Sequence, residues 1–367
     1  MTTTELFYTL ALLQVEGVGD ISAKKLITQL GSAENVFKTS RKELKSMYRF
    51  KDKLIERLSD ESVFEKAEKE LAFIQSQNIE AIFFKEPNYP GRLKHCSDGP
   101  TLLFQKGATN LQQHRTLSIV GTRNITNYGI DFTRNLIETL QPLNPVIVSG
   151  FAYGVDIVAH QAAMDCNLQT VGVLAHGLNQ IYPKSHKKYC SKMEANGGFL
   201  TEFWSTSNPE RENFVKRNRI VAGISEATIV IESAEKGGSL ITANLANDYN
   251  REVFAVPGRT SDKYSQGCNL LIKTQRAHLL SSAEDLIYHL NWNINESEVK
   301  SVQKQLFVEL EPEEQKVYDF LVQRGKEVLD LIAIECQLPV HKISTLLLQM
   351  ELKGVIRPLP GKQFEAI

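Results

Sequence analysis

The sequence predicts an α/β fold in which a doubly wound, mostly parallel sheet occupies the middle of the chain. Between about residues 80 and 290, short runs of β-branched and other apolar residues alternate with stretches long enough to form helices. The runs are apolar along nearly their whole length, as in strands that helices cover on both faces. Most of them end in a loop that carries glycine or a polar residue. Together these patterns predict an extended Rossmann-type domain with further segments on either side.

The segment 1–75 contains helical patterns only. Its clearest feature is a turn with two glycines, Gly17 and Gly19, between two helical runs, which predicts a helix-hairpin-helix (SAM-like) domain. Amide groups at the start of the second helix could bind a phosphate of DNA, but such hairpins also serve packing or protein contacts, and both roles stay open. The letters Gly17-x-Gly19-x-x-Ser22 come close to a dinucleotide-binding fingerprint. No strand precedes them, so we do not assign that function.

Seven runs within the expected sheet domain, residues 80–290, are candidate strands. They are residues 117–120, 145–149, 170–174, 198–201, 227–231, 252–256 and 277–280. In an open α/β sheet, ligands bind at the carboxyl ends of the parallel strands. The loops that follow these runs are therefore the place to look for a functional site.

The C-terminal part predicts a small separate domain at 311–367. Residues 291–310 are polar and weakly periodic, which indicates a linker. Three helical runs and two short extended segments then follow, at 313–324, 328–335, 340–353, 355–357 and 363–365. Three helices and a hairpin are typical of a winged-helix domain. Its third helix carries only His341, Lys342 and Lys353 as basic residues, so a protein contact or a structural role is at least as well supported as DNA binding.

The composition indicates a globular protein of balanced charge. Lys and Arg number 42 and Asp and Glu 43, so any surface that binds nucleic acid has to be local. Five dispersed cysteines without a CxxC pair predict free thiols and no zinc site. The first residues lack the features of a signal peptide, and no apolar run approaches the roughly 20 residues of a membrane span. We therefore expect a cytoplasmic protein without membrane contact.

Three loops after candidate strands combine glycine with a hydroxyl group. Their candidate binding residues are Gly121, Thr122 and Arg123, then Ser149, Gly150, Phe151 and Gly154, then Lys236, Gly238 and Ser239. Amide groups at a helix N-terminus attract anions, and arginine can hold a phosphate with two hydrogen bonds. Because the carboxyl ends of parallel strands share one edge of a sheet, we expect one elongated anion site.

Further cations lie between these loops in the sequence. They are Lys184 and Lys187 after one strand, and Arg217 and Arg219, with Asn218 between them, at the start of an apolar helix. So many cations suit the repeated phosphates of a nucleic-acid strand better than one mononucleotide. Four aromatic residues nearby could stack on bases: Phe151, Tyr153, Tyr182 and Phe214. Taken singly, each of these side chains is as easily explained as a solvated charge or a core residue, and only the grouping supports binding.

The sequence contains no motif that points to catalysis. It lacks GxxxxGK[ST], GxSxG and HExxH motifs, and the acids expected at the strand ends are only Asp156, Glu202 and Glu232. His160 and His176 have no serine or cysteine partner suggested by the local sequence. We therefore predict a binding protein with no catalytic residue, no metal and no cofactor.

Seven segments resemble the motifs of the DNA-processing protein A family (DprA, also called Smf), in the family's order. They are 118–129 (SIVGTRNITNYG), 148–160 (VSGFAYGVDIVAH), 177–183 (GLNQIYP), 214–223 (FVKRNRIVAG), 237–243 (GGSLITA), 251–258 (REVFAVPG) and 267–272 (GCNLLI). The resemblance is highly specific for about 80–285. The helical and winged-helix segments match a common layout of the family more loosely.

The resemblance implies a protein that binds and protects incoming single-stranded DNA, dimerises through the Rossmann domain, and loads RecA during natural transformation. By position, Arg123 matches the family's DNA-contacting arginine and Lys184 its basic residue after the YP pair. The remaining pocket motifs match at Ser149, Gly150, Gly154, Arg217, Arg219, Gly238 and Ser239. The chain departs from the family at His186, where Asn is frequent, at Val215, where Pro is frequent, and at Arg276, where Gly is usual. The first two departures lie beside the expected groove.

Two other functions stay open. Rossmann folds host many enzymes that act on nucleotides or nucleoside phosphates. Such relatives usually present a PGGxGT turn followed by Glu, whereas residues 235–240 (EKGGSL) have no third glycine and no following acid. A scaffold that binds only proteins is the third possibility.

Overall fold

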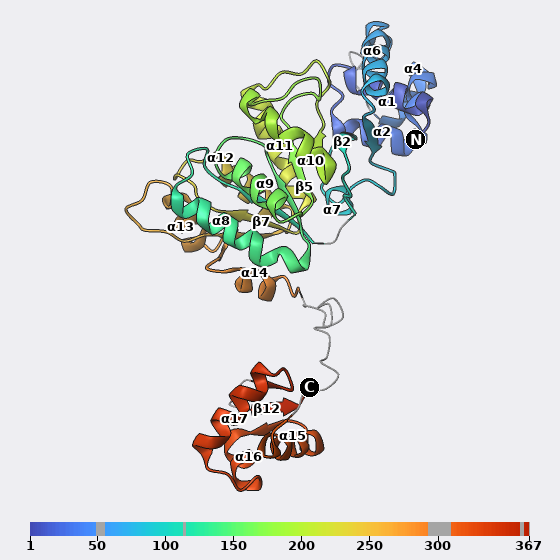
Figure 1. The fold of residues 1–367 in the computed structure, drawn as a ribbon. Coiled ribbons are helices and arrows are strands. Elements are labelled where there is room, and N and C mark those ends of the chain that lie inside the picture. The colour runs from blue at the N-terminus through green and yellow to red at the C-terminus, as the bar shows by residue number, and fades with distance from the viewer. Residues whose placement is uncertain (49–55, 113–114, 293–309, 360–362, 367) are drawn as a thin grey trace. The chain divides into compact units, whose positions relative to one another are not determined.

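The computed structural model describes residues 1–48, 56–112, 115–292, 310–359 and 363–366. The chain divides into two compact units, Met1–Trp292 and Asn293–Ile367 (Figure 1). The linker predicted at 291–310 lies almost entirely outside the described residues.

The first unit is built on a nine-stranded sheet of order β1-β2-β6-β5-β4-β3-β7-β8-β9. Its seven strands from β6 to β9 are all parallel, which confirms the predicted fold class. Each predicted strand is confirmed to within one or two residues. The bounds are β3 Thr116–Val120, β4 Val146–Ser149, β5 Thr170–Val173, β6 Gly197–Thr201, β7 Ala227–Val230, β8 Glu252–Ala255 and β9 His278–Leu279.

Two strands at the edge of the sheet were not predicted. β1 (Glu80–Phe83) pairs with β2 (Leu102–Gly107), and β2 pairs with β6, both in antiparallel orientation. The short helix α7 (Gly91–Lys94) lies between them in the chain. This pair extends the parallel sheet and joins it to the N-terminal helices.

Helices cover both faces of the parallel strands, and the strand residues alternate between the two cores. Val146 and Val148 of β4 belong to the core beneath α11 (Arg211–Ile224) and α12 (Gly238–Asp248). Ile147 between them packs under α8 and α9 on the opposite face. The remaining bounds are α8 Asn127–Leu140, η1 Gln141–Leu143, α9 Val155–Asp165, η2 Lys184–Tyr189, α10 Cys190–Ala195, α13 Gln266–Lys273 and α14 Ala283–His289.

The N-terminal helices pack on the antiparallel edge strands. Buried residues of α1 and α2 share one core with Phe83 of β1 and Phe104 of β2. The helices are α1 Thr3–Gln14, α2 Asp20–Leu30, α3 Ala33–Lys38, α4 Arg41–Tyr48 and α6 Ser62–Ser76. They belong to the same compact unit as the sheet. The boundary expected between residues 75 and 80 stays a prediction.

The second unit has the three helices and the hairpin of a winged-helix domain. Its helices are α15 Pro312–Arg324, α16 Leu329–Glu335 and α17 Val340–Leu352, and its strands are β10 Glu327–Val328, β11 Ile356–Leu359 and β12 Gln363–Ala366. The strands form an antiparallel sheet of order β10-β12-β11. Only the two-residue strand β10 was not expected. This confirms the predicted winged-helix fold.

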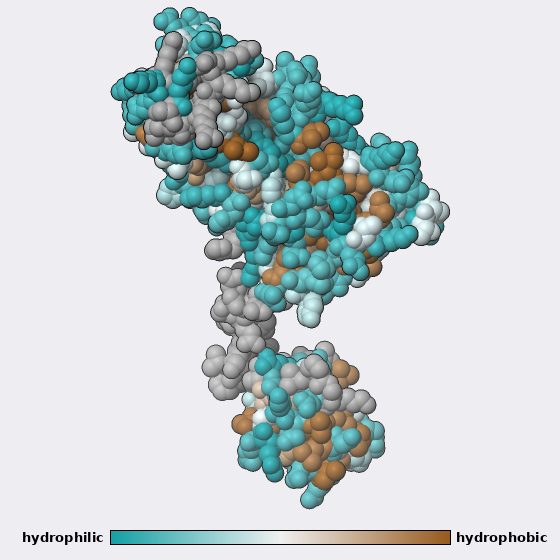
Figure 2. Space-filling view, turned by 180° about the vertical axis from the view of Figure 1, so that it is seen from behind, coloured by the Kyte–Doolittle hydropathy of each residue, from teal (hydrophilic) through white to brown (hydrophobic). Residues whose placement is uncertain are grey.

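The surface of this unit carries large apolar side chains (Figure 2). Ile334 is 70% exposed, Leu348 58% and Val340 49%. Such a surface favours a protein contact over a DNA contact for α16 and α17.

In the described part of the chain, no single helix is long and apolar enough to cross a membrane. Only α16 and α17 taken together pass on length and composition, and they are bent by 109° relative to each other.

Candidate functional site

The order of the parallel strands reverses at β3, which pairs with β4 on one side and with β7 on the other. A crevice outside the carboxyl ends of the strands is expected at such a point. A cavity with a volume of about 600 Å³ opens there, and we call it the switch-point pocket. It is lined by loops after β3, β4 and β7 and by the first turns of α11 and α12.

Nine of the fifteen predicted site residues line the switch-point pocket. They are Gly121, Thr122, Arg123, Gly150, Arg217, Asn218, Lys236, Gly238 and Ser239. The three predicted loops therefore do meet at one edge of the sheet.

Glycines allow the loops after β3 and β4 to touch. A Cβ atom on Gly154 would overlap the carbonyl oxygen of Thr122, and Gly154 has a φ of 76°, which few other residues adopt. A Cβ on Gly121 would overlap the side chain of Val155. Gly154 does not line the pocket, but it allows the start of α9 to approach the backbone of Thr122 and Arg123.

Arg217 is a buried cation in the wall of the pocket. Its side chain is only 4% exposed, and its Nη1 donates a hydrogen bond of 2.6 Å to the carbonyl of Val173. Its Nε has no hydrogen-bond partner among the described residues. Burial lowers the pKa of Arg217 to about 10, so the guanidinium stays charged at neutral pH. A buried guanidinium with an unused donor is a strong point of attraction for an anion.

Phe214 joins the cations of the pocket. The guanidinium carbon of Arg123 lies 5.3 Å from the centre of the Phe214 ring, and that of Arg217 lies 5.9 Å from it. The ring of Tyr182 packs edge-on against Phe214 at 6.0 Å. The half-buried Phe214 ring thus fixes the position of two arginines.

The N-terminus of α12 faces the pocket. Gly237 caps the helix without a side-chain hydrogen bond, and a Cβ on Gly238 would meet no atom within 4 Å. The hydroxyl of Ser239 is already bound to that of Ser233, at 2.9 Å. The open amide groups of this first turn carry partial positive charge and can accept an anion.

The lining of the switch-point pocket is strongly cationic. Arg123, Arg211, Arg217 and Lys236 contribute positive charges, and Asp156 is the only acidic side chain among the lining residues. Burial raises the pKa of Asp156 from its ordinary value, and the neighbouring cation Arg217 opposes this shift. The pocket as a whole therefore attracts anions.

Arg211 also lines the pocket and was not predicted from the sequence. Arg211 precedes Phe214 by three residues on α11, and Arg217 follows Phe214 by three. Residues at this spacing lie on one face of a helix. The spacing was therefore a signal that could have identified Arg211.

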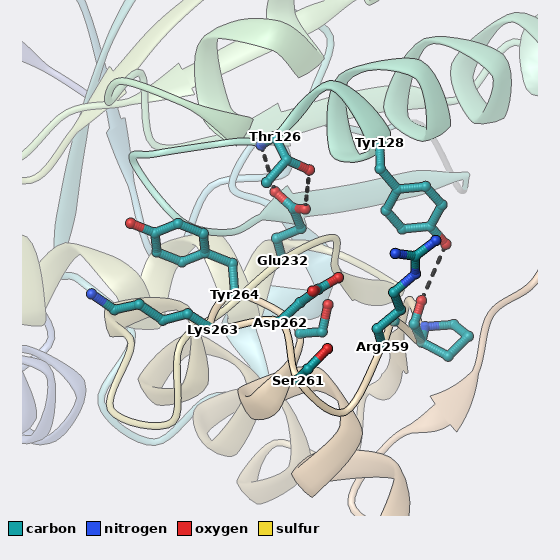
Figure 3. A pocket seen from close by; sticks show the side chains of 11 residues that line it. Thr126, Tyr128, Glu232, Arg259, Ser261, Asp262, Lys263 and Tyr264 are labelled. Carbon is teal, nitrogen blue, oxygen red and sulfur yellow. Dashed lines mark hydrogen bonds between the residues drawn. The ribbon is translucent and has the colours of Figure 1, made fainter.

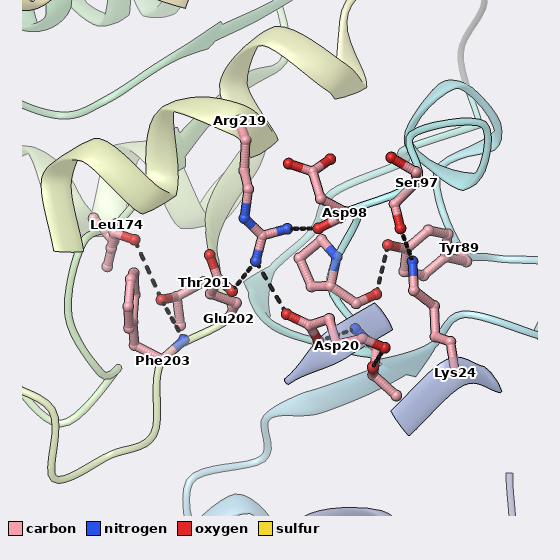
Figure 4. Close-up of polar contacts among 12 residues, drawn as sticks. Asp20, Lys24, Tyr89, Ser97, Asp98, Leu174, Thr201, Glu202, Phe203 and Arg219 are labelled. Atoms are coloured by element: carbon pink, nitrogen blue, oxygen red, sulfur yellow. Dashed lines mark hydrogen bonds and ion pairs between the residues drawn. The ribbon is translucent and has the colours of Figure 1, made fainter. Parts of the chain in front are cut away.

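Arg219 does not line the switch-point pocket, and its predicted role in DNA binding stays a prediction. Its guanidinium forms ion pairs with Asp20 at 3.1 Å and with Glu202, and donates to the carbonyl of Asp98 (Figure 4). The side chain is 13% exposed and faces away from the pocket lining. Two residues along a helix turn the side chain by about 200°, so Arg217 and Arg219 cannot serve the same cavity.

The same network includes Asp20 of the N-terminal hairpin. Asp20, the first residue of α2, accepts a hydrogen bond of 2.6 Å from the amide of Thr101 and pairs with Arg219. The Asp20 side chain at the start of α2 is thus engaged in contacts within the unit (Figure 4). This favours the structural role of the glycine turn over a DNA contact.

Two further predicted residues are buried in other interactions. The Phe151 side chain is fully buried in the core with Phe199, so it cannot stack on a base as expected. The Ser149 hydroxyl donates to the carbonyl of Ile119 at 2.6 Å and is also fully buried. Both residues support the loop after β4 from within.

Lys184 and Lys187 are exposed on η2 and do not line the pocket. Their segment lies beside it, because Tyr182 contacts Phe214 and the Tyr153 hydroxyl lies 3.1 Å from that of Ser185. They are positioned to extend the positive charge outward. Within the described ranges, no group of three His, Cys, Asp or Glu side chains could hold a metal ion.

Comparison with known proteins gives a consistent picture. The family model described as DNA recombination-mediator protein A matches residues 80–291, and a DprA winged-helix model matches 305–362. The chain is 30% identical to Protein Smf of Synechocystis sp. over the whole of both chains. It is 34% identical to Protein Smf of Escherichia coli over 80% of this chain and 79% of that protein.

Two solved structures extend this similarity to the fold. The structure of DNA processing protein A from Streptococcus pneumoniae matches with a TM-score of 0.65 and 28% identity, over 78% of this chain and 98% of that one. That from Helicobacter pylori, solved to study its single-stranded DNA binding mode, matches with a TM-score of 0.53 and 29% identity, over 58% and 96%.

Proposed function

This chain belongs to the DNA recombination-mediator protein A family (DprA, or Smf), and we propose that it binds single-stranded DNA without catalysing a reaction. The phosphates lie in the switch-point pocket. The observation that carries this proposal is the meeting of four cations and the open N-terminus of α12 in one cavity at the sheet edge.

The distribution of charge supports a strand over a single nucleotide. One phosphate needs one or two cations, whereas Arg123, Arg211, Arg217 and Lys236 all line the pocket. Lys184 and Lys187 add exposed charge beside it. A nucleic-acid strand carries several phosphates, so each of these cations can pair with one of them. The H. pylori relative, described by its single-stranded DNA binding mode, supports the same ligand.

The remaining roles rest on family membership. The protein forms a homodimer through its Rossmann domain in the cytoplasm, protects incoming DNA and loads RecA on it during natural transformation. We expect RecA filaments to form faster on DNA coated by single-strand-binding protein when this chain is added. Unchanged filament growth would contradict the loading role and leave DNA binding untouched.

Substitution of Arg123 tests the binding site. Because Arg123 is exposed and lines the pocket, Arg123→Ala should weaken binding to an oligonucleotide and flatten the dependence of log K on log[salt] by about 0.7, as one phosphate contact is lost. Fluorescence anisotropy at several salt concentrations measures both quantities. Arg134→Ala on α8 removes an exposed arginine outside the pocket and is the matched control. Equal affinity and slope in both variants would place the DNA elsewhere.

Asp156 is the observation that favours the alternative function, an enzyme that acts on nucleotides. It is a buried carboxylate in the lining of the pocket, as a nucleotide-processing enzyme would need. Incubation with nucleotides and nucleoside monophosphates should release neither phosphate nor base. Release at ordinary enzymatic turnover would replace our proposal with the alternative.

A further inference from the structure

A second cavity opens at the same edge of the sheet, with a volume of about 870 Å³ (Figure 3). Its walls are the start of α8 and the loop 257–265 that follows β8, and we call it the tyrosine pocket after Tyr128 and Tyr264. Glu232 lines this cavity and the next residue, Ser233, lines the switch-point pocket. The two pockets are therefore neighbours at the end of β7.

The walls of the tyrosine pocket are fixed by hydrogen bonds. The carbonyl of Tyr264 accepts the amide of Ser233 at 2.6 Å. Gly258 and Asn269 exchange two hydrogen bonds, of 3.2 and 2.9 Å. The cavity is thus formed before any ligand enters, which lowers the entropy cost of binding.

The charges in this pocket balance, in contrast to those of its neighbour. Arg259 and Lys263 oppose Glu232 and Asp262. The Glu232 carboxylate is held at the base by the backbone amide of Thr126 at 2.8 Å and by the Thr126 hydroxyl. A balanced lining does not favour a chain of phosphates.

The tyrosine pocket is distinguished by its two aromatic rings, Tyr128 and Tyr264. Figure 3 shows Tyr128 beside Arg259 and Tyr264 beside Lys263, with Glu232 between the two pairs. The Tyr128 side chain is 51% exposed and its hydroxyl donates to the carbonyl of Pro257 at 3.1 Å. An exposed ring, Tyr128, and a partly buried one, Tyr264, line a cavity whose charges balance. Such a lining suits a flat, neutral ligand with hydrogen-bonding edges, and a nucleobase has this chemistry.

We propose that the tyrosine pocket receives bases of the same DNA strand whose phosphates occupy the switch-point pocket. This inference rests on the proposed function. Tyr128 and Tyr264 stack on the bases, while Arg259 and Lys263 reach the phosphates at the rim. The strand then runs along the sheet edge from the ends of β3 and β4 toward the end of β8.

Binding of oligonucleotides of two lengths tests the tyrosine pocket separately from the switch-point pocket. One of about 4 nucleotides fills the cationic pocket, and one of about 12 also reaches the tyrosine pocket. Tyr128→Ala should weaken binding of the longer strand about tenfold or more, and leave binding of the shorter one unchanged. Tyr128→Phe keeps the ring and should bind both strands as the natural chain does. Tyr264→Ala and Tyr264→Phe repeat the comparison on the other wall.

A strand with abasic residues gives a second measurement. The longer oligonucleotide without bases should bind the natural chain about as weakly as the complete one binds Tyr128→Ala, and the substitution should not weaken it further. Equal affinities of Tyr128→Ala and the natural chain for both lengths, or equal losses for both lengths, would overturn the inference while DNA binding stands. Equal losses in the Phe and Ala variants would also overturn it. If the natural chain binds no oligonucleotide, the proposed function fails and the inference with it.

Discussion

The guanidinium of Arg217 occupies the space next to Gly150 that a side chain at position 150 would need. A Cβ atom on Gly150 would overlap the guanidinium of Arg217, which is buried against the end of β5. Gly150 is therefore needed because it lets the Arg217 guanidinium lie close to the backbone. Its role in the pocket is to keep Arg217 in this position.

Gly150→Ala should consequently affect both stability and binding. We expect a loss of about 1–3 kcal/mol in the free energy of unfolding from overpacking, and weaker DNA binding because Arg217 is displaced. Denaturant unfolding and anisotropy measure the two effects. Gly91→Ala is the control, since a Cβ there would meet no atom within 4 Å. Natural stability and affinity in Gly150→Ala would contradict this account of the pocket wall.

Residue types could be predicted from the sequence more easily than side-chain directions. Arg123, Arg217 and Lys236 were placed correctly in the pocket lining. Arg219 was not, because a local motif does not reveal which face of α11 meets the sheet edge and which meets α2. Phe151 failed for a similar reason: its place at the end of a strand does not show that its ring turns into the core.

At the scale of elements, the parallel strands could be predicted because each is a continuous apolar run. β1 and β2 were missed. β1 pairs with β2, and β2 joins the sheet by pairing with β6, a contact between residues distant in the sequence. Tertiary pairing of this kind leaves no local period. The position of the N-terminal helices on this edge was unpredictable for the same reason.

The contact between α2 and α11 should depend on pH through Glu202. Burial raises the pKa of Glu202 to about 7 from 4.5, with smaller contributions from the charges of Asp20 and Asp98, while Arg219 and Lys216 oppose the shift. A raised pKa gives stability that is fully present below about 4.5 and is lost as pH rises through about 7. Glu202→Gln should remove this component.

Urea unfolding checks this prediction. Between about pH 4.5 and 7, the natural chain should lose up to about 3 kcal/mol relative to Glu202→Gln. DNA binding of the folded variant should be unchanged, because Glu202 does not line the pocket. Parallel stability curves for the two chains would show that Glu202 titrates normally.

At the scale of the whole molecule, both proposed DNA pockets lie within the first unit. All the lining residues belong to Met1–Trp292, which has its own cores. The winged-helix unit has a separate core and an apolar surface. We infer that it serves another contact.

Truncation tests this division of roles. A chain ending at Trp292 should fold and keep the affinity and salt dependence of the full chain for single-stranded DNA within about twofold. Anisotropy of the two chains side by side gives the comparison. A loss of most of the affinity in the folded truncated chain would assign DNA contacts to the second unit.

The most direct test of the central claim is an experimental structure of the full chain with a single-stranded oligonucleotide of about 12 residues. We expect a phosphate within hydrogen-bonding distance of Arg123, Arg217 and the amide of Gly238. A strand bound on another surface, with these groups still in contact only with one another and with water, would contradict this claim.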